Sequence, residues 1–261
     1  MGQHANVLQD AHEERILSAH GVLQRLEILE PGHLGQSVDD PFDVLQLEFW
    51  NRTLRRIWSP DGTTLGPGSE SAPSLTSTNG ALTPSDVEYM VAESGIVPVG
   101  RVLQQKFHYG GRGVRTWTLY RITPPLRLRR TIEGVYADGW GKPVTALNQF
   151  SFGDSRPRLV KVHVFRTGAA RLYPATVEVR IGTIGIVANP NSLGVPALAA
   201  VRSTKSIRVP NHLNHTFTFR APPTPFRVET SVTPFPHSRD PAIGDPRDLG
   251  ANVQYSVVPG S

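Results

Sequence analysis

The feature that most constrains the fold of this chain is a set of short runs in which apolar side chains recur at every second position. These positions are Val160/Val162/Val164, Val177/Val179/Ile181, Phe217/Phe219, Phe226/Val228/Thr230/Val232 and Val253/Tyr255/Val257. A period of two places alternate side chains on one face, which is typical of a strand with one buried face. Clusters of Gly and Pro separate the runs, and the chain has 24 Gly and 23 Pro. We therefore predict an antiparallel β-sandwich, jelly-roll-like, over residues 122–261. Asp245–Gly250 predicts a turn before the last strand, with Arg247 available for an ion pair.

The first 121 residues predict a small α/β subdomain, so the fold class expected for the whole chain is α+β. The expected elements are helices at Ala11–Glu27 and from Asp40 to about Thr53, and strands at Leu54–Trp58, Val87–Ala92 and Val97–Gln104. Asp40 and Pro41 are typical of a helix start, as N-cap and first helical residue. Gly95 is expected to form the turn between the last two strands. Residues 62–84 are rich in Gly, Ser, Thr and Pro without periodicity, which predicts a long surface loop or linker.

Several classes of function lack support in the sequence. The absence of cysteine excludes disulfides, thiolate metal sites and cysteine nucleophiles. No nucleophile elbow, phosphate-binding loop or dinucleotide fingerprint is present. His212 and His215 lie at a strand entry, where their spacing points them to opposite faces, so we expect no metal there. We therefore assign no catalytic residue, metal or cofactor. The chain contains no run of about 18 apolar residues and no signal-peptide core, so it is expected to be soluble as written.

The net charge of +5 has a local source in a run of eight basic residues without an acid between Arg101 and Ile132. The simpler interpretation is a solvated strand surface that faces acids elsewhere in the fold. The alternative interpretation is a patch that faces an anion. The run carries no recognised DNA- or RNA-binding motif, so we expect no nucleic-acid partner.

The segment Glu133–Trp140 combines an acid, two glycines and two large aromatic residues with a second acid. Sugar recognition needs an aromatic face for stacking and carboxylates or amides that bond hydroxyl groups. Tyr136, Asp138 and Trp140, with Asn148 downstream, supply these groups and are our candidate carbohydrate-binding residues. The alternative is purely structural: Asp138 and Gly139 form a common turn dipeptide, and Trp140 caps the sandwich core.

A set of motifs resembles one known protein region. The motifs are Leu47–Thr53, Thr118–Ile122, Pro125–Leu128, Glu133–Trp140, Pro225–Glu229 and Asp245–Gly250. Together they resemble the C-terminal, extracytoplasmic region of actinobacterial polytopic membrane proteins related to family-39-type glycosyltransferases. The resemblance covers roughly residues 44–258 in order, and the first 40 residues match poorly. None of the motifs is a catalytic signature.

The resemblance implies a non-catalytic accessory module at the extracytoplasmic face of the cell membrane, which binds carbohydrate or positions an acceptor for glycosyl transfer. Its implied partners are a cell-envelope glycan or lipid-linked sugar, and a polytopic membrane glycosyltransferase. The catalytic acid of that family belongs to a membrane portion that this sequence does not contain. An alternative is a structural docking module that uses an apolar Phe49–Trp58 face. A glycosidase would need two carboxylates that face a cleft, and the sequence does not support one.

Overall fold

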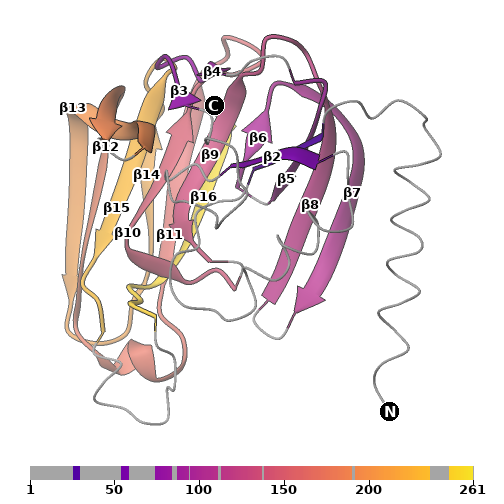
Figure 1. Cartoon of the computed structure of the whole chain (residues 1–261). Coiled ribbons are helices and arrows are strands. Elements are labelled where there is room, and N and C mark those ends of the chain that lie inside the picture. Colours follow the sequence, from indigo (N-terminus) through magenta and orange to yellow (C-terminus); the bar gives the residue numbers. More distant parts are fainter. Residues whose placement is uncertain are drawn as a thin grey trace, which may run out of the picture.

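The computed structural model describes residues 26–29, 54–58, 74–83, 87–93, 95–110, 113–136, 138–189, 192–235 and 247–260. Most of these residues lie in strands, and the helical element among them is one short 3-10 helix, η1 (Gly168–Leu172). The C-terminal half forms two facing antiparallel sheets (Figure 1), which confirms the predicted sandwich.

The larger sheet of the sandwich has the strand order β13-β12-β15-β10-β9-β6 in the described part of the chain. Its strands are β6 (Val97–Pro98), β9 (Leu128–Val135), β10 (Gly141–Gln149), β12 (Ala175–Asn189), β13 (Ser192–Val209) and β15 (Phe226–Val232). The smaller sheet has the order β14-β11-β16. Its strands are β11 (Arg158–Phe165), β14 (Asn214–Arg220) and β16 (Asn252–Pro259).

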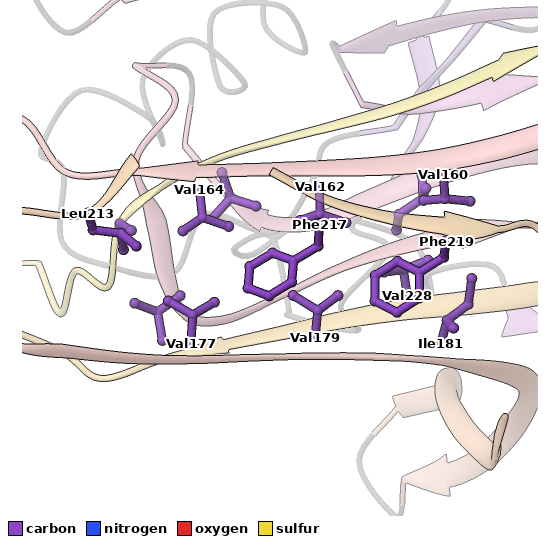
Figure 2. Packing of buried hydrophobic residues seen from close by; sticks show 14 of the residues in the cluster. Val160, Val162, Val164, Val177, Val179, Ile181, Leu213, Phe217, Phe219 and Val228 are labelled. Atoms are coloured by element: carbon purple, nitrogen blue, oxygen red, sulfur yellow. The ribbon is translucent and has the colours of Figure 1, made fainter. Parts of the chain in front are cut away.

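The core between the two sheets consists of the alternating residues that the sequence pattern singles out. Val162 on β11 lies opposite Phe217 on β14 in the small sheet, and Ile181 on β12 lies opposite Val228 on β15 in the large sheet. Figure 2 shows side chains from both sheets meeting in the space between them. Because each strand contributes every second residue to this layer, a shift in register by one residue would expose the whole set.

Tyr255 of β16 is a polar residue that links the two sheets inside the sandwich. Its hydroxyl lies 2.7 Å from the Oγ1 of Thr145 on β10 and donates to the Oγ1 of Thr230 on β15 at 2.8 Å. Burial raises the pKa of the Tyr255 hydroxyl well above its usual value, so the group stays protonated and can donate.

The N-terminal part contributes a separate five-stranded sheet of order β2-β1-β5-β8-β7. Its strands are β1 (Leu26–Leu29), β2 (Leu54–Trp58), β5 (Tyr89–Glu93), β7 (Gly100–Gly110) and β8 (Gly113–Ile122). The strand at Leu54–Trp58 is confirmed. The expected helix over Ala11–Glu27 is wrong at its end, since Leu26 and Glu27 belong to β1 and pair in parallel with β2 and β5. The rest of that helix, and the helix after Asp40, lie outside the described residues.

The expected structureless loop at residues 62–84 is wrong for its second half. Residues 74–83 form a small hairpin of β3 (Ser74–Leu75) and β4 (Leu82–Thr83). Leu75 and Leu82 are buried in a second core that also contains Met90 of β5 and Ile184 of β12. Strands of two residues are too short to show an alternation of apolar and polar residues in the sequence. The hairpin forms because the fold buries these two leucines.

The strand expected at Val97–Gln104 is split between two sheets. β6 pairs with β9 of the sandwich, whereas β7 pairs with β8 of the N-terminal sheet. The turn predicted at Gly95 is present, and this glycine has a φ of 101° that side chains rarely adopt.

Leu147 and Leu172 provide a matched test of the inter-sheet core. The Leu147 side chain is 0% exposed on β10, whereas Leu172 at the end of η1 is 70% exposed. Leu147→Ala should lower the free energy of unfolding by about 2–5 kcal/mol because it leaves a cavity. Leu172→Ala should change it by at most about 0.5 kcal/mol. Urea unfolding measures both, and equal effects would contradict this description of the core.

The buried Tyr255 hydroxyl predicts a loss of stability in alkali. Its pKa is raised on folding. The contribution of this hydroxyl to the free energy of unfolding is therefore complete below its pKa in the unfolded chain, about 10, and is lost as the pH rises towards its pKa in the folded protein. The free energy of unfolding should therefore fall above about pH 10. Tyr255→Phe should be less stable at pH 7, since Thr145 and Thr230 lose a partner, but its decline above pH 10 should be shallower. Parallel declines in urea titrations of the two proteins would contradict the assignment.

Candidate functional site

The connection between β9 and β10 is a tight turn that presents three of the sequence-predicted site residues together. The Tyr136 N–H donates to the Trp140 carbonyl at 2.7 Å, and the Gly139 N–H donates to the Tyr136 carbonyl at 2.8 Å. Gly139 has a φ of 82°, which is the left-handed conformation expected of the glycine in an Asp-Gly turn. The backbone thus matches the structural alternative given for this segment, and it also holds Tyr136, Asp138 and Trp140 side by side.

Asp138 joins this turn to a distant loop. One carboxylate oxygen accepts from the Trp140 N–H at 3.1 Å, and the other accepts from the Arg247 guanidinium at 2.7 Å. The guanidinium carbon of Arg247 also lies 4.5 Å from the centre of the Tyr136 ring, within the range of a cation–π contact. The ion pair for which Arg247 was predicted to be available is therefore present, and its partner is a candidate site residue.

Aromatic rings gather around Phe235 at this end of the sandwich. Phe235 is buried, and its ring centre lies 5.6 Å from that of Trp140 and 6.3 Å from that of Tyr173. Tyr136, Trp140 and Tyr173 are all half-buried, so each keeps part of its surface in solvent. We call Tyr136, Trp140, Tyr173 and Phe235 the aromatic end.

Arg166 packs against the aromatic end and hydrogen-bonds to the segments on either side of it. Its side chain donates to the carbonyl oxygens of Tyr173 at 3.3 Å and of Thr233, and its guanidinium carbon lies 5.9 Å from the Phe235 ring centre. The residue is only 2% exposed, and burial lowers its pKa to about 10. The guanidinium thereby holds the chain before β12 and the chain after β15 in fixed positions.

Sequence reasoning missed Arg166, although a signal exists. Residue 166 continues the inward register of Val160, Val162 and Val164, so an arginine at this position has to be buried. A buried cation needs acceptors, and carbonyl groups from neighbouring loop segments supply them here.

The structure does not bring Asn148 to the aromatic end. Asn148 is fully buried near the far end of β10, about 26 Å along the strand from Trp140 at about 3.3 Å per residue. Its amide donates to Thr131 at 2.9 Å and to Glu133, and its carbonyl accepts from Arg227 at 2.8 Å. It belongs to a second polar cluster on the face of the large sheet that points away from the inter-sheet core.

That second cluster is an ion-pair network across β9, β15 and β12. The Arg227 guanidinium lies 2.9 Å from a carboxylate oxygen of Glu133 and 3.4 Å from one of Glu229. Arg180 pairs with Glu229 from the other side. The carboxylates of Glu133 and Glu229 are thus both close to the Arg227 guanidinium, and Glu229 also pairs with Arg180. This arrangement compensates buried charge and fixes strand register, as expected of a structural network.

No group of three or more His, Cys, Asp or Glu side chains among the described residues is arranged to hold a metal ion. Within the same residues, no helix is long and apolar enough to cross a membrane.

Arg227 and Arg180 provide a matched pair for testing the network. Arg227→Met should lower the free energy of unfolding by about 3–5 kcal/mol, since it leaves the Glu133 charge and the Asn148 carbonyl without this partner. Arg180→Met should cost at most about 1 kcal/mol, because the Arg180 side chain is 38% exposed and water replaces the lost contact. The double variant Arg227→Met/Glu133→Gln should recover part of the loss. Equal effects of the two single variants in urea unfolding would contradict the network.

Comparison with known proteins finds no relative for this chain: no family model, no curated protein and no solved structure matches it. The resemblance to the extracytoplasmic tail of family-39-type glycosyltransferases therefore stays an expectation that rests on the sequence motifs alone.

Proposed function

We propose that this chain is a non-catalytic binding module that takes carbohydrate at its aromatic end. The observation that carries the proposal is the convergence there of half-buried Tyr136 and Trp140 with the Asp138–Arg247 ion pair, on the rigid end of a β-sandwich.

The chemistry of these groups suits a sugar. The exposed part of an indole or phenol ring stacks on the C–H-rich face of a pyranose or furanose, and burial of that apolar surface favours binding. A carboxylate accepts hydrogen bonds from hydroxyl groups and a guanidinium donates them. Asp138 keeps 20% of its side chain exposed although it is bonded to Arg247, so it has acceptor capacity left for a hydroxyl group.

The rigidity of the aromatic end lowers the entropy that binding costs. The turn is closed by two backbone hydrogen bonds, and the Asp138–Arg247 pair ties it to the loop that contains Arg247. Arg166 links the segments at Tyr173 and Thr233, which flank the Phe235 ring. Groups already held in their binding geometry lose little freedom when a ligand arrives.

The motif resemblance supports a more specific form of the proposal. In that form the module works at the extracytoplasmic face of a membrane, and its ligand is a cell-envelope glycan or lipid-linked sugar. A module without catalysis would there raise the local concentration of an acceptor near a glycosyltransferase through weak contacts. The alternative of a docking module depends on a Phe49–Trp58 face whose side chains lie outside the described ones.

A glycan array followed by titration of the best-bound glycan tests the proposal. Trp140→Ala should weaken binding about tenfold because stacking surface is lost, whereas Trp140→Phe should keep most of the affinity. Asp138→Asn should weaken binding and leave the turn in place, since an amide oxygen still accepts from the Trp140 N–H.

Tyr89→Ala is the control, because this half-buried aromatic residue lies on β5 in the other sheet. Thermal melting checks that every variant folds. The proposal fails if no glycan binds, or if binding survives both Trp140→Ala and Asp138→Asn.

A further inference from the structure

The register of the strands places Trp140 in one row with Phe165 on the outer surface of the sandwich. Trp140 lies opposite Asn252 in an antiparallel bridge, and Asn252 in turn lies opposite Phe165 of β11. Residues that lie opposite each other on neighbouring strands point to the same side of a sheet. Val164, the residue before Phe165, points into the inter-sheet core, so the row of Trp140, Asn252 and Phe165 points outwards.

A second pair of rings belongs to this outward face. His163 lies two residues before Phe165 on β11, so both side chains point outwards, and their ring centres are 5.1 Å apart. Both side chains are half-buried, so each keeps part of its surface in solvent. The His163 Nδ1 lies 2.9 Å from the Thr216 Oγ1 in a hydrogen bond, which orients the imidazole. We call His163 and Phe165 the ring pair.

Amide side chains flank the ring pair on both neighbouring strands. On β16, Asn252 lies opposite Phe165 and Gln254 lies opposite His163. On β14, Asn214 lies opposite Phe165. Gln254 and Asn214 are exposed, and an amide group both donates hydrogen bonds to hydroxyl groups and accepts them. The ring pair therefore offers the same two kinds of group as the aromatic end, which are ring surface for stacking and polar groups for hydroxyls.

The ring pair lies too far from Trp140 for both to contact the same sugar ring. β16 lies between them, and neighbouring strands are about 4.8 Å apart, so the backbones at Trp140 and Phe165 are about 10 Å apart. A single pyranose or furanose cannot stack on rings at that separation. The two stacking positions nevertheless belong to one surface, because both lie next to Asn252 in the same row.

From this arrangement we propose that the carbohydrate site continues from the aromatic end onto the ring pair and takes an extended glycan chain. The inference rests on the proposed function and names its ligand class as a chain of several sugars. One sugar of the chain stacks on Trp140 beside Asp138, and another sugar of the same chain stacks on the ring pair. Each stacked sugar buries further apolar surface, and the second contact costs less because the first already holds the chain nearby.

Calorimetric titration with oligosaccharides of increasing length tests the inference. The probes are linear gluco-, manno-, galacto- and xylo-oligosaccharides of one to six residues. In a series that binds, the affinity should rise about tenfold between the monosaccharide and the first chain that reaches the ring pair, and then level off.

Two variants separate the ring pair from the aromatic end. Phe165→Ala should weaken binding of the hexasaccharide about fivefold because stacking surface is lost, and it should leave the affinity for the monosaccharide unchanged. Gln254→Ala changes an exposed side chain and should weaken hexasaccharide binding about threefold through a lost hydrogen bond, again without effect on the monosaccharide. Trp140→Ala should weaken the binding of both.

Leu159→Ala is the matched control, because this half-buried residue points to the same face of β11 six residues before Phe165. It should bind both probes as the parent chain does, and thermal melting checks that each variant folds. The inference is overturned if the affinity does not depend on chain length. It is also overturned if Phe165→Ala and Gln254→Ala weaken hexasaccharide binding no more than Leu159→Ala, or if they weaken monosaccharide binding equally.

The failure of this inference differs from the failure of the proposed function. If Trp140→Ala weakens monosaccharide binding while chain length has no effect, the proposed function stands and the extended site is wrong. If none of the four series binds, both are wrong.

Discussion

The rest of the structure depends on the apolar layer between the two sheets of the sandwich. Val160, Val162 and Val164 of one sheet face Val179 and Val228 of the other, and none of these side chains is exposed to water. The chain has no cysteine, so no disulfide links the sheets, and burial of apolar surface has to supply the stability. The partly buried Tyr255 adds a polar contact between the two sheets, where a hydroxyl without partners would be costly.

Arginine side chains connect segments that the strand ladders leave apart. Arg166 gathers carbonyl oxygens of two loop segments, Arg247 reaches Asp138 in the turn between β9 and β10, and Arg227 joins Glu133 to Glu229. The guanidinium groups of Arg166 and Arg227 each donate to more than one partner, and that of Arg247 adds a cation–π contact with Tyr136 to its ion pair. A lysine ammonium at the same positions would do this less well. The aromatic end has its shape because two of these arginines hold the loops around Phe235.

The aromatic end brings together the groups on which the proposed function depends. The aromatic end offers ring faces and a carboxylate, which suits a neutral polyhydroxylated ligand.

The amino-acid sequence by itself determined that the segments with alternating apolar residues form strands of the sandwich, and which of their residues point inward. A period of two is a local property, so Val160 and Phe226 could be assigned to the core without knowledge of their neighbours. The turn at Asp138 and Gly139 is local as well. Only the tertiary structure decided which strands pair. It gives Asp138 a partner 109 residues away, places Arg227 against Asn148, and buries the isolated Leu75 and Leu82. These outcomes depend on contacts between segments far apart in the chain. The periodicity of one segment does not indicate which distant segment packs against that segment.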